Sequence, residues 1–332
     1  MMLMVSVQNL TEAVEAHQGG ADIVDVKNLQ EALVGSGHPQ IVESVRSEIP
    51  QEKHVSVTLG VVPNQAGTVA MAVYAAGRMN ATSVKVGFMN TDYESAVDIL
   101  LQSKEALAGT QTKLIGSLFA DNPLYAGLSP HHMVQLAKDG QCDGWLIDTL
   151  TKDGRNLFDF MTEAELYDMV FKGKELKMST ALSGHLRMQD INELARINPD
   201  IVGVRGAVCA SGDRQTSVAR ESVASFKYEL DLRQSGQVDV FNTTTEQITQ
   251  SLSSGWVVID GSNKSCAGII ASLTEQIEHD DLSIIEVILP DLLTVNDMIV
   301  WAEKGAHRII TQRTDSKGQP RLLIQPCSII TN

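Results

Sequence analysis

Apolar, strand-like runs recur at regular intervals along most of the chain. They lie at residues 3–7, 22–27, 54–60, 83–88, 113–120, 144–149, 177–184 and 200–206. Each is followed by a segment whose apolar residues recur every three to four positions, the period of an amphipathic helix. These helical segments lie at residues 10–18, 39–49, 67–79, 93–107, 129–140, 163–173, 187–197 and 215–230. Eight consecutive strand–helix units of this length predict a (β/α)8 (TIM) barrel, an α/β fold.

The main alternative to the barrel is a doubly wound open sheet. Eight consecutive units favour the barrel, and the first strand lacks the G-x-G-x-x-G turn of dinucleotide-binding folds. A polar break at 233–239 precedes a further stretch with its own alternation of helices and strands. The sequence therefore predicts a barrel domain at 1–234 and a small α/β domain at 235–332. No chemistry can be assigned to the small domain, which leaves homo-oligomer assembly or partner binding as its role.

Charge and composition exclude several classes of function. The net charge of −15 argues against a nucleic-acid groove, which needs basic residues to face phosphates. No apolar run reaches the length of a membrane span, and the N-terminus lacks the basic start of a signal peptide. The cysteines are scattered, without metal-ligand spacing, at Cys142, Cys209, Cys266 and Cys327. We therefore expect free thiols, no bound metal and a reducing, cytoplasmic location.

Two charged residues lie inside the second predicted strand, in the stretch DIVDVKN at 22–28. Because strand side chains alternate, Asp25 and Lys27 point to one face while Val24 and Val26 point to the other. In a barrel the valines would pack under the helices and the two charges would face the lumen. This interpretation places an acid and an amine near the carboxyl end of the strand, where active sites of this fold lie.

The same alternation places further charged residues on the lumen side. Lys85 in the fourth strand, Asp148 in the sixth and Arg205 in the eighth follow the rule. A lysine is a nucleophile only as the neutral amine, which burial and a neighbouring cation both favour. Two lysines with two aspartates therefore predict Schiff-base chemistry on a carbonyl compound, with the acids moving protons. The alternative is a set of buried ion pairs that only fills the lumen.

Loops after the later strands are candidates for binding an anion. The loops after the seventh and eighth strands read LSGH at 182–185 and RGAVCASGDR at 205–214. Loops in these positions often bind phosphate in this fold, because small residues let backbone N–H groups approach an anion. The predicted phosphate-binding residues are small or basic: Lys152, Gly184, Arg205, Gly206 and Ala207. The alternative is that these residues form tight turns and a solvated loop.

Four stretches together resemble one known family. They are DVKN at 25–28, VKVG at 84–87, LIDTLTKDGRNLFDF at 146–160 and DIVGVRGAVCASGDR at 200–214. In order and spacing they closely resemble the (5-formylfuran-3-yl)methyl phosphate synthases of methanofuran biosynthesis, over roughly residues 3–232.

The resemblance implies a lyase on a (β/α)8 barrel. Such an enzyme condenses two glyceraldehyde 3-phosphate molecules into (5-formylfuran-3-yl)methyl phosphate, releasing phosphate and water. Lys27 matches the family's Schiff-base lysine and Lys85 its proton-transfer lysine, while Asp25 and Asp148 match its acidic residues. The resemblance implies triose phosphates as ligands, and neither a metal nor an organic cofactor.

The chain departs from the family in the loop after the second strand, DVKNLQEALVGSG, where Leu29 replaces a proline and Ala32 a glycine. The seventh strand ends in SGH where Gly-Ser is more typical, and residues 235–332 have no counterpart in the short members. Two other functions stay open. One is a class I aldolase that uses the same lysine and stops at the aldol product, and the other is a non-catalytic binding or scaffold protein.

Overall fold

The computed structural model describes residues 1–29, 35–151, 155–212, 214–238, 240, 256–279, 284–314 and 319–326. The chain packs into two compact units. The first comprises Met1–Met161, Asp168–Met188 and Asn198–Leu230, and the second comprises Thr162–Tyr167, Gln189–Ile197 and Asp231–Asn332. The domain limits 1–234 and 235–332 stay predictions.

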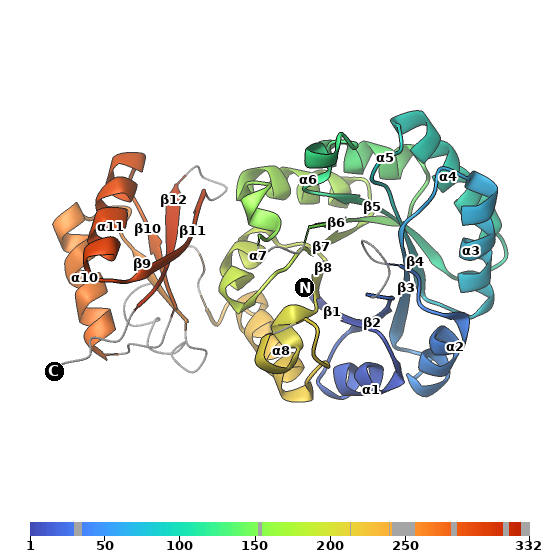
Figure 1. Ribbon diagram of the computed structural model, residues 1–332, viewed down its shortest axis with the longest axis horizontal. Coiled ribbons are helices and arrows are strands. Elements are labelled where there is room, and N and C mark those ends of the chain that lie inside the picture. The colour runs from blue at the N-terminus through green and yellow to red at the C-terminus, as the bar shows by residue number, and fades with distance from the viewer. Residues whose placement is uncertain are drawn as a thin grey trace. The chain divides into compact units, whose positions relative to one another are not determined.

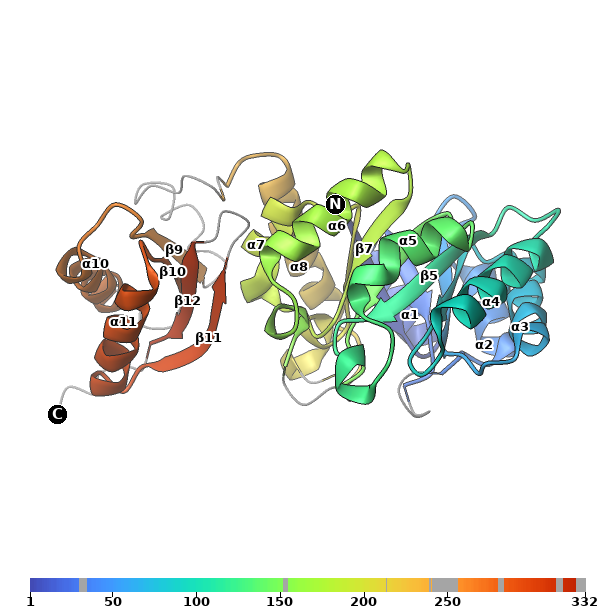
Figure 2. The same ribbon diagram turned by 90° about the horizontal axis from the view of Figure 1, so that it is seen from above.

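The first unit contains a closed barrel of parallel strands in chain order, β1 to β8 (Figure 1). The strands are β1 (Met2–Val7), β2 (Ile23–Val26), β3 (His54–Val61), β4 (Ser83–Gly87), β5 (Lys113–Phe119), β6 (Gly144–Asp148), β7 (Ser179–Leu182) and β8 (Ile201–Val204). In Figure 1 helices surround the strands, and Figure 2 shows the same elements turned by 90°. The helices that follow these strands are α1 (Leu10–Gln18), α2 (Pro39–Glu48), α3 (Ala66–Arg78), α4 (Tyr93–Ala106), α5 (Met133–Asp139), α6 (Glu163–Glu175), α7 (Ile191–Ile197) and α8 (Arg220–Gln234). Of these, α7, the start of α6 and the end of α8 belong to the second unit. The predicted (β/α)8 barrel is confirmed.

Both faces of the barrel strands are buried, as parallel strands in this architecture require. Val24 and Val26 of β2 are 2% and 0% exposed. Gly37, before α2, packs so closely on Val26 that an added Cβ would lie 2.8 Å from the Val26 Cγ1. The starts of α1 and α4 are capped by short polar side chains. Asn9 accepts a hydrogen bond from the Glu12 N–H of α1, and Asp92 caps α4 in the same way.

The helix predicted at 215–230 is wrong in its start, because α8 begins at Arg220. The preceding loop is folded instead into two short 3-10 turns, Gly206–Val208 and Ala210–Gly212, and Cys209 forms a bridge with Val218. The Arg205 side chain donates to the carbonyl oxygens of Arg214 and Thr216. These contacts use backbone carbonyls that a longer helix would need for its own hydrogen bonds.

The second unit contains a four-stranded sheet in the order β11-β12-β10-β9. Its elements are β9 (Trp256–Asp260), α10 (Cys266–His279), β10 (Ile284–Ile288), α11 (Leu292–Lys304), β11 (Arg308–Thr314) and β12 (Pro320–Gln325). β9 and β10 are parallel, and β12 is antiparallel to both β10 and β11. This separate mixed sheet confirms the predicted small α/β domain.

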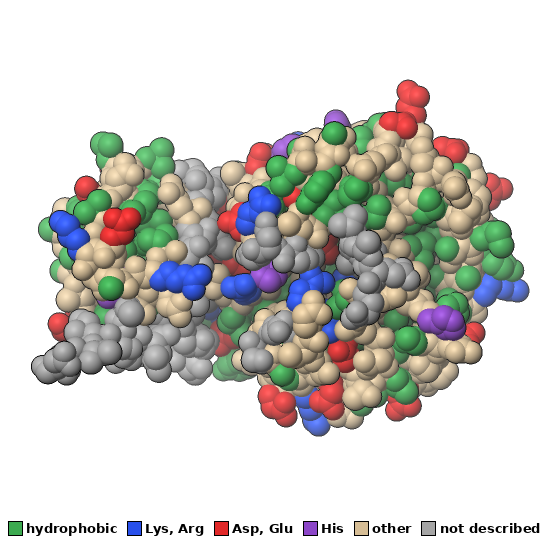
Figure 3. Space-filling model, in the orientation of Figure 1, with side chains coloured by type: hydrophobic (Ala, Val, Ile, Leu, Met, Phe, Trp, Pro, Cys, Tyr) green, Lys and Arg blue, Asp and Glu red, His purple; other side chains and the backbone are tan. Residues whose placement is uncertain are grey.

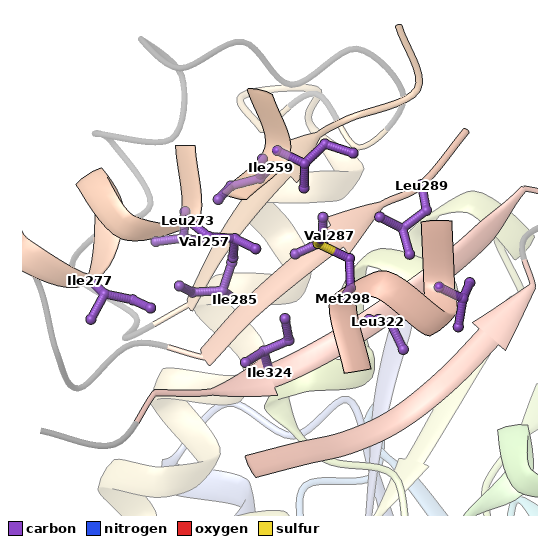
Figure 4. Packing of buried hydrophobic residues seen from close by; sticks show 12 residues of the cluster. Val257, Ile259, Leu273, Ile277, Ile285, Val287, Leu289, Met298, Leu322 and Ile324 are labelled. Carbon is purple, nitrogen blue, oxygen red and sulfur yellow. The ribbon is translucent and has the colours of Figure 1, made fainter. Parts of the chain in front are cut away.

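One face of this sheet forms a hydrophobic core with α10 and α11 (Figure 4). Alternate strand residues supply it, and Leu273, Ile277 and Met298 supply the helix side. On the same strands, Glu286 of β10 and Arg321 of β12 are both buried and pair at 2.8 Å. Across the residues that the structure describes, no helix is both long and apolar enough to cross a bilayer.

Candidate active site

The lumen of the barrel brings charged side chains together at the carboxyl ends of neighbouring strands. Asp25 is in β2, Lys27 follows its last residue, and Lys85 is in β4. Between them β3 contributes Thr58, which pairs with Lys85 in the strand register. These side chains therefore lie on the lumen side, as the alternation of strand residues predicts.

One buried carboxylate connects the two lysines. The Nζ of Lys85 lies 2.6 Å from Oδ1 of Asp25, and the Nζ of Lys27 lies 3.7 Å from Oδ2. The hydroxyl of Thr58 donates to the same carboxylate at 3.0 Å. Asp25 is 0% exposed and Lys85 4%. A buried charge is costly unless it is paired, so this cluster is held together by its own electrostatics.

Burial and charge pull in opposite directions on Asp25. Burial would raise the pKa of its carboxyl, but the charges of Lys85 and Lys27 and the hydrogen bonds from Lys85 and Thr58 outweigh this and lower it. For Lys85 the balance is reversed. Burial lowers the pKa of its ammonium more than the Asp25 charge raises it, and the Lys27 charge lowers it further. Lys85 is therefore a cation that gives up its proton more readily than an exposed lysine does.

Two small cavities meet at Lys27 and Asp148. The first, of about 20 Å³, is also lined by Lys85, Thr58 and Gly87, and the second, of about 40 Å³, by residues of β8 and its loop. Lys27 and Asp148 line both cavities. Asp148, at the end of β6, accepts the Thr149 N–H at 2.7 Å. The amine of Lys27 therefore has a space on either side, with one acid beside both.

The predicted phosphate-binding residues do not all reach these cavities. Gly206 and Arg205 line the 40 Å³ cavity, whereas Gly184 and Ala207 line neither. Lys152 lies outside the described residues. The binding role of all five stays a prediction.

Arg205 uses its N–H groups inside the protein. It pairs with both carboxylate oxygens of Glu12 on α1, at 2.8 and 3.1 Å. The remaining donors reach the carbonyl oxygens of Ser6, Arg214 and Thr216. Since a guanidinium has five N–H donors, this pattern engages all of them and ties the β8 loop to α1 and β1.

Gly184 is needed for its backbone conformation. Its φ of +116° is a region that residues with a Cβ rarely adopt, and an added Cβ would lie 2.9 Å from the Thr149 Cγ2. The residue therefore lets the β7 loop pack directly against the end of β6, beside Asp148.

Arg214 is a further cation of the site and was not among the residues predicted from the sequence. Its side chain lines the 40 Å³ cavity with Lys27 and Asp148. Burial lowers the pKa of its guanidinium, while the Asp148 charge raises it. Its place at the end of the glycine-rich stretch RGAVCASGDR was the available signal, because a basic residue closing such a loop suits a phosphate.

His185 also lines the 40 Å³ cavity and has a φ of +55°. Its Nε2 lies 2.6 Å from Nη2 of Arg187.

Basic and acidic side chains are interspersed over the face of the molecule shown in Figure 3. Among the described residues, no group of three or more His, Cys, Asp or Glu side chains is placed to hold a metal ion.

Comparison with known proteins decides the family. The model of the 4-HFC-P synthase family matches residues 3–227. The chain belongs to this family. It is 36% identical over 231 residues to the (5-formylfuran-3-yl)methyl phosphate synthase of Methanobrevibacter smithii, which covers 68% of this chain and 98% of the relative.

A second relative gives the same result. The (5-formylfuran-3-yl)methyl phosphate synthase of Methanothermobacter thermautotrophicus is 36% identical over 234 residues, which cover 70% of this chain and 99% of the relative. As a member of this family the chain is an enzyme. Its C-terminal region, with the separate small sheet, lies beyond the family match.

Solved structures show the fold alone. The ribulose-1,5-bisphosphate carboxylase/oxygenase of Pyrococcus horikoshii aligns with a TM-score of 0.50 at 12% identity, covering 76% of this chain and 61% of that chain. This likeness agrees with a (β/α)8 barrel.

Proposed function

We propose that this enzyme condenses two molecules of glyceraldehyde 3-phosphate into (5-formylfuran-3-yl)methyl phosphate, with loss of phosphate and water, in the cytoplasmic synthesis of a methanofuran-type cofactor. One observation carries the proposal. In a member of the 4-HFC-P synthase family, Lys27 and Lys85 share one buried carboxylate, that of Asp25, at the carboxyl end of the barrel. The names of the relatives support the same reaction.

Lys27 is the nucleophile of the proposed reaction. Its neutral amine attacks the aldehyde carbon of one triose phosphate, and loss of water leaves an iminium. Lys27 suits this role because it lines both cavities, so its amine borders the open space of both. Asp148 lines the same two spaces and can donate the proton that leaves with the hydroxyl group.

Lys85 then moves a proton from carbon. The iminium draws electrons from the neighbouring C–H, and the Lys85 amine accepts that proton, leaving an enamine on Lys27. The ammonium so formed is stabilised by Asp25 at 2.6 Å. Electrons of the enamine expel the phosphate from the next carbon, or attack the aldehyde of the second triose phosphate. Ring closure with loss of water and release of Lys27 gives the furan.

Phosphate binding is assigned to the β8 loop. Arg214 and the backbone at Gly206 face the 40 Å³ cavity next to Lys27. A cation and backbone N–H groups, fixed before the substrate arrives, stabilise an anion without reorganisation. Arg205 holds this loop in place through Glu12 and the loop carbonyls.

The experiment is incubation of the full chain with glyceraldehyde 3-phosphate. We expect free phosphate and a new ultraviolet-absorbing furan aldehyde phosphate, identified by mass spectrometry. A sugar bisphosphate without phosphate release would instead show a class I aldolase. No product of either kind, in a folded protein, would favour a binding or scaffold role.

Borohydride trapping tests whether Lys27 forms the Schiff base. Reduction during turnover should leave a covalent substrate adduct on Lys27, located by peptide mapping. Lys27→Ala should lose the adduct and the furan product, whereas Lys138→Ala, on the last turn of α5, keeps both. Full activity of Lys27→Ala would disprove the Schiff base on Lys27.

A further inference from the structure

A third cavity, of about 410 Å³, lies inside the barrel at the amino ends of the strands. Its lining includes the first residues of β3, β4 and β8, which are His54, Ser83 and Ile201. We call it the lower cavity. It lies at the opposite end of the barrel from the two small cavities at Lys27, and the proposed reaction gives it no role.

Lys85 connects the two ends of the lumen. It lines the lower cavity and also the 20 Å³ cavity that contains Lys27 and Asp148. Its ammonium donates to Asp25 at 2.6 Å and to the sulfur of Met4 at 3.1 Å. An ammonium has three N–H groups, so these partners leave one of them for a water in either cavity.

The lining of the lower cavity includes an apolar wall and, on β3 and β4, a polar wall. The apolar wall consists of buried or half-buried residues from five strands: Met4, Ile23, Ile115, Ala181 and Ile201. The polar wall belongs to β3 and β4 and carries His54, Ser56, Ser83 and Lys85. A space of this size with polar groups on one side accommodates ordered water against that side.

The polar wall is a hydrogen-bonded chain. Nε2 of His54 lies 2.9 Å from the hydroxyl of Ser83, which donates to the hydroxyl of Ser56 at 3.1 Å. In this arrangement His54 donates to Ser83 through Nε2, because the one hydroxyl proton of Ser83 is directed to Ser56. Ser56 pairs with Asp25 in the strand register, so the chain ends beside the Asp25–Lys85 ion pair.

We propose that His54, Ser83 and Ser56 are a proton relay that connects Lys85 with solvent through the lower cavity. The inference rests on the proposed function, because the proton it carries is the one that Lys85 exchanges with substrate carbon. It explains how Lys85 returns to the neutral amine while substrates occupy the upper end, where the two cavities of about 20 and 40 Å³ leave little space for water.

The proton balance of the relay is simple. For a proton entering, solvent protonates Nδ1 of His54, and Nε2 passes its proton to Ser83. Ser83 passes its own proton to Ser56, and Ser56 passes its own to a water beside Lys85, which protonates the amine. Each member gains one proton and loses one, so His54 ends neutral as the other tautomer. A proton leaving Lys85 follows the reverse steps.

The surroundings of His54 suit a neutral relay group. The pKa of its imidazole is lowered to about 4, chiefly by burial; the charges of Lys85 and Arg46 also lower it, and the charge of Asp25 raises it. Three more charged residues line the cavity: Lys113, Asp143 and Lys177. A neutral imidazole has one donor and one acceptor nitrogen, which is what transfer in either direction requires.

The test uses glyceraldehyde 3-phosphate deuterated at carbon 2. In the wild-type enzyme we expect the deuterium to be lost to solvent, because Lys85 exchanges its proton through the relay. In Ser83→Ala and His54→Ala we expect label loss and kcat to fall about 10²-fold, with KM and the amount of borohydride-trapped Lys27 adduct unchanged. Added imidazole should restore kcat in His54→Ala, a rescue that a purely structural role would not show.

Ser179→Ala is the matched control, because Ser179 lines the same cavity at the start of β7 but is not a member of the proposed relay. With Ser179→Ala the substrate should lose its deuterium at the wild-type rate. The relay is disproved if Ser83→Ala and His54→Ala also do so, or if Ser179→Ala slows label loss as much as they do. If His54→Ala fails to fold, Ser83→Ala decides alone. A wild-type enzyme that forms neither adduct nor furan would disprove the proposed function instead.

Discussion

The ammonium of Lys85 and the carboxylate of Asp25 form a buried ion pair at 2.6 Å, and the same carboxylate lies 3.7 Å from Lys27. The Asp25 charge is the main influence that keeps Lys85 protonated against the effect of burial. We predict that Asp25→Asn lowers the pKa of Lys85 further and lowers kcat by about 10²–10⁴-fold, the range of a lost acid–base partner.

The measurement is the pH dependence of kcat. In Asp25→Asn the part of the pH–kcat curve that reflects the titration of Lys85 should move to lower pH, because the neutral amine is favoured once its counter-ion is gone. Asp98→Asn, on the exposed side of α4, removes a carboxylate of the same size far from the lumen and should keep the wild-type profile. A wild-type kcat in Asp25→Asn would show that the ion pair has no part in proton transfer.

Two arginines of the β8 loop should behave differently when replaced. Arg214 faces the 40 Å³ cavity, so Arg214→Ala should raise KM for glyceraldehyde 3-phosphate about 10–100-fold, the loss of one charge-assisted contact to phosphate. Its melting temperature should stay near that of the wild type. Steady-state kinetics and thermal denaturation of the same preparation measure both quantities.

Arg205→Lys is the comparison for that variant. A lysine cannot make the paired contact with both oxygens of Glu12 or reach the three carbonyl oxygens at once. We expect Arg205→Lys to lower the melting temperature and to change KM less than Arg214→Ala does. If Arg214→Ala leaves KM unchanged, the phosphate is bound elsewhere in the loops.

The alternation of apolar and polar residues was sufficient to predict the barrel and its central charges. In a parallel barrel the parity of one residue determines its face, so Asp25 and Lys85 could be placed in the lumen from their valine neighbours alone. Their ion pair follows because β3 is the single strand between β2 and β4. At these positions the order of apolar and polar residues along each strand is therefore enough to predict which side chains meet in the lumen.

Contacts between distant segments were beyond the sequence pattern. Arg205 was predicted to bind phosphate, but its carboxylate partner Glu12 is 193 positions away on α1, and no period links the two. The relay chain is similar, since His54 and Ser83 are 29 positions apart and meet only because β3 and β4 pair in register. Such partners depend on strand register and loop paths, which a single sequence does not specify.

The buried imidazole of His54 should make the protein less stable in mild acid. Its pKa is about 4 in the folded protein, lowered by burial, and near the ordinary value of about 6.5 in the unfolded chain. As the pH falls from about 6.5 to about 4, the unfolded chain takes up a proton that the folded protein does not. The free energy of unfolding should therefore fall by about 2 kcal/mol over this interval.

Urea denaturation of the wild type and of His54→Gln, at pH 7 and pH 4.5, measures this contribution. Glutamine keeps a polar group next to Ser83 but does not titrate, so its loss of stability between the two pH values should be smaller. Acid effects on other groups, such as Asp25, are common to both proteins and cancel in the comparison. Equal losses in the two proteins would mean that His54 titrates normally in the folded state.

Gly184 offers a last test, of how the β7 loop supports Asp148. Both Gly184 and Gly212 have positive φ, +116° and +70°, but only Gly184 has no room for a Cβ, because Thr149 lies 2.9 Å away. Gly212→Ala therefore carries backbone strain alone, about 1 kcal/mol. Gly184→Ala adds a clash, and its φ lies farther from the left-handed region that L residues can adopt, so it should cost about 1–3 kcal/mol more.

The clash should also affect catalysis, because Thr149 donates its N–H to Asp148 at 2.7 Å. We expect Gly184→Ala to lower kcat, and Gly212→Ala to leave it unchanged while losing less stability. Thermal denaturation and steady-state kinetics of both variants separate strain from displacement. Equal stability losses would show that Thr149 moves aside freely, and then kcat should also be equal in the two variants.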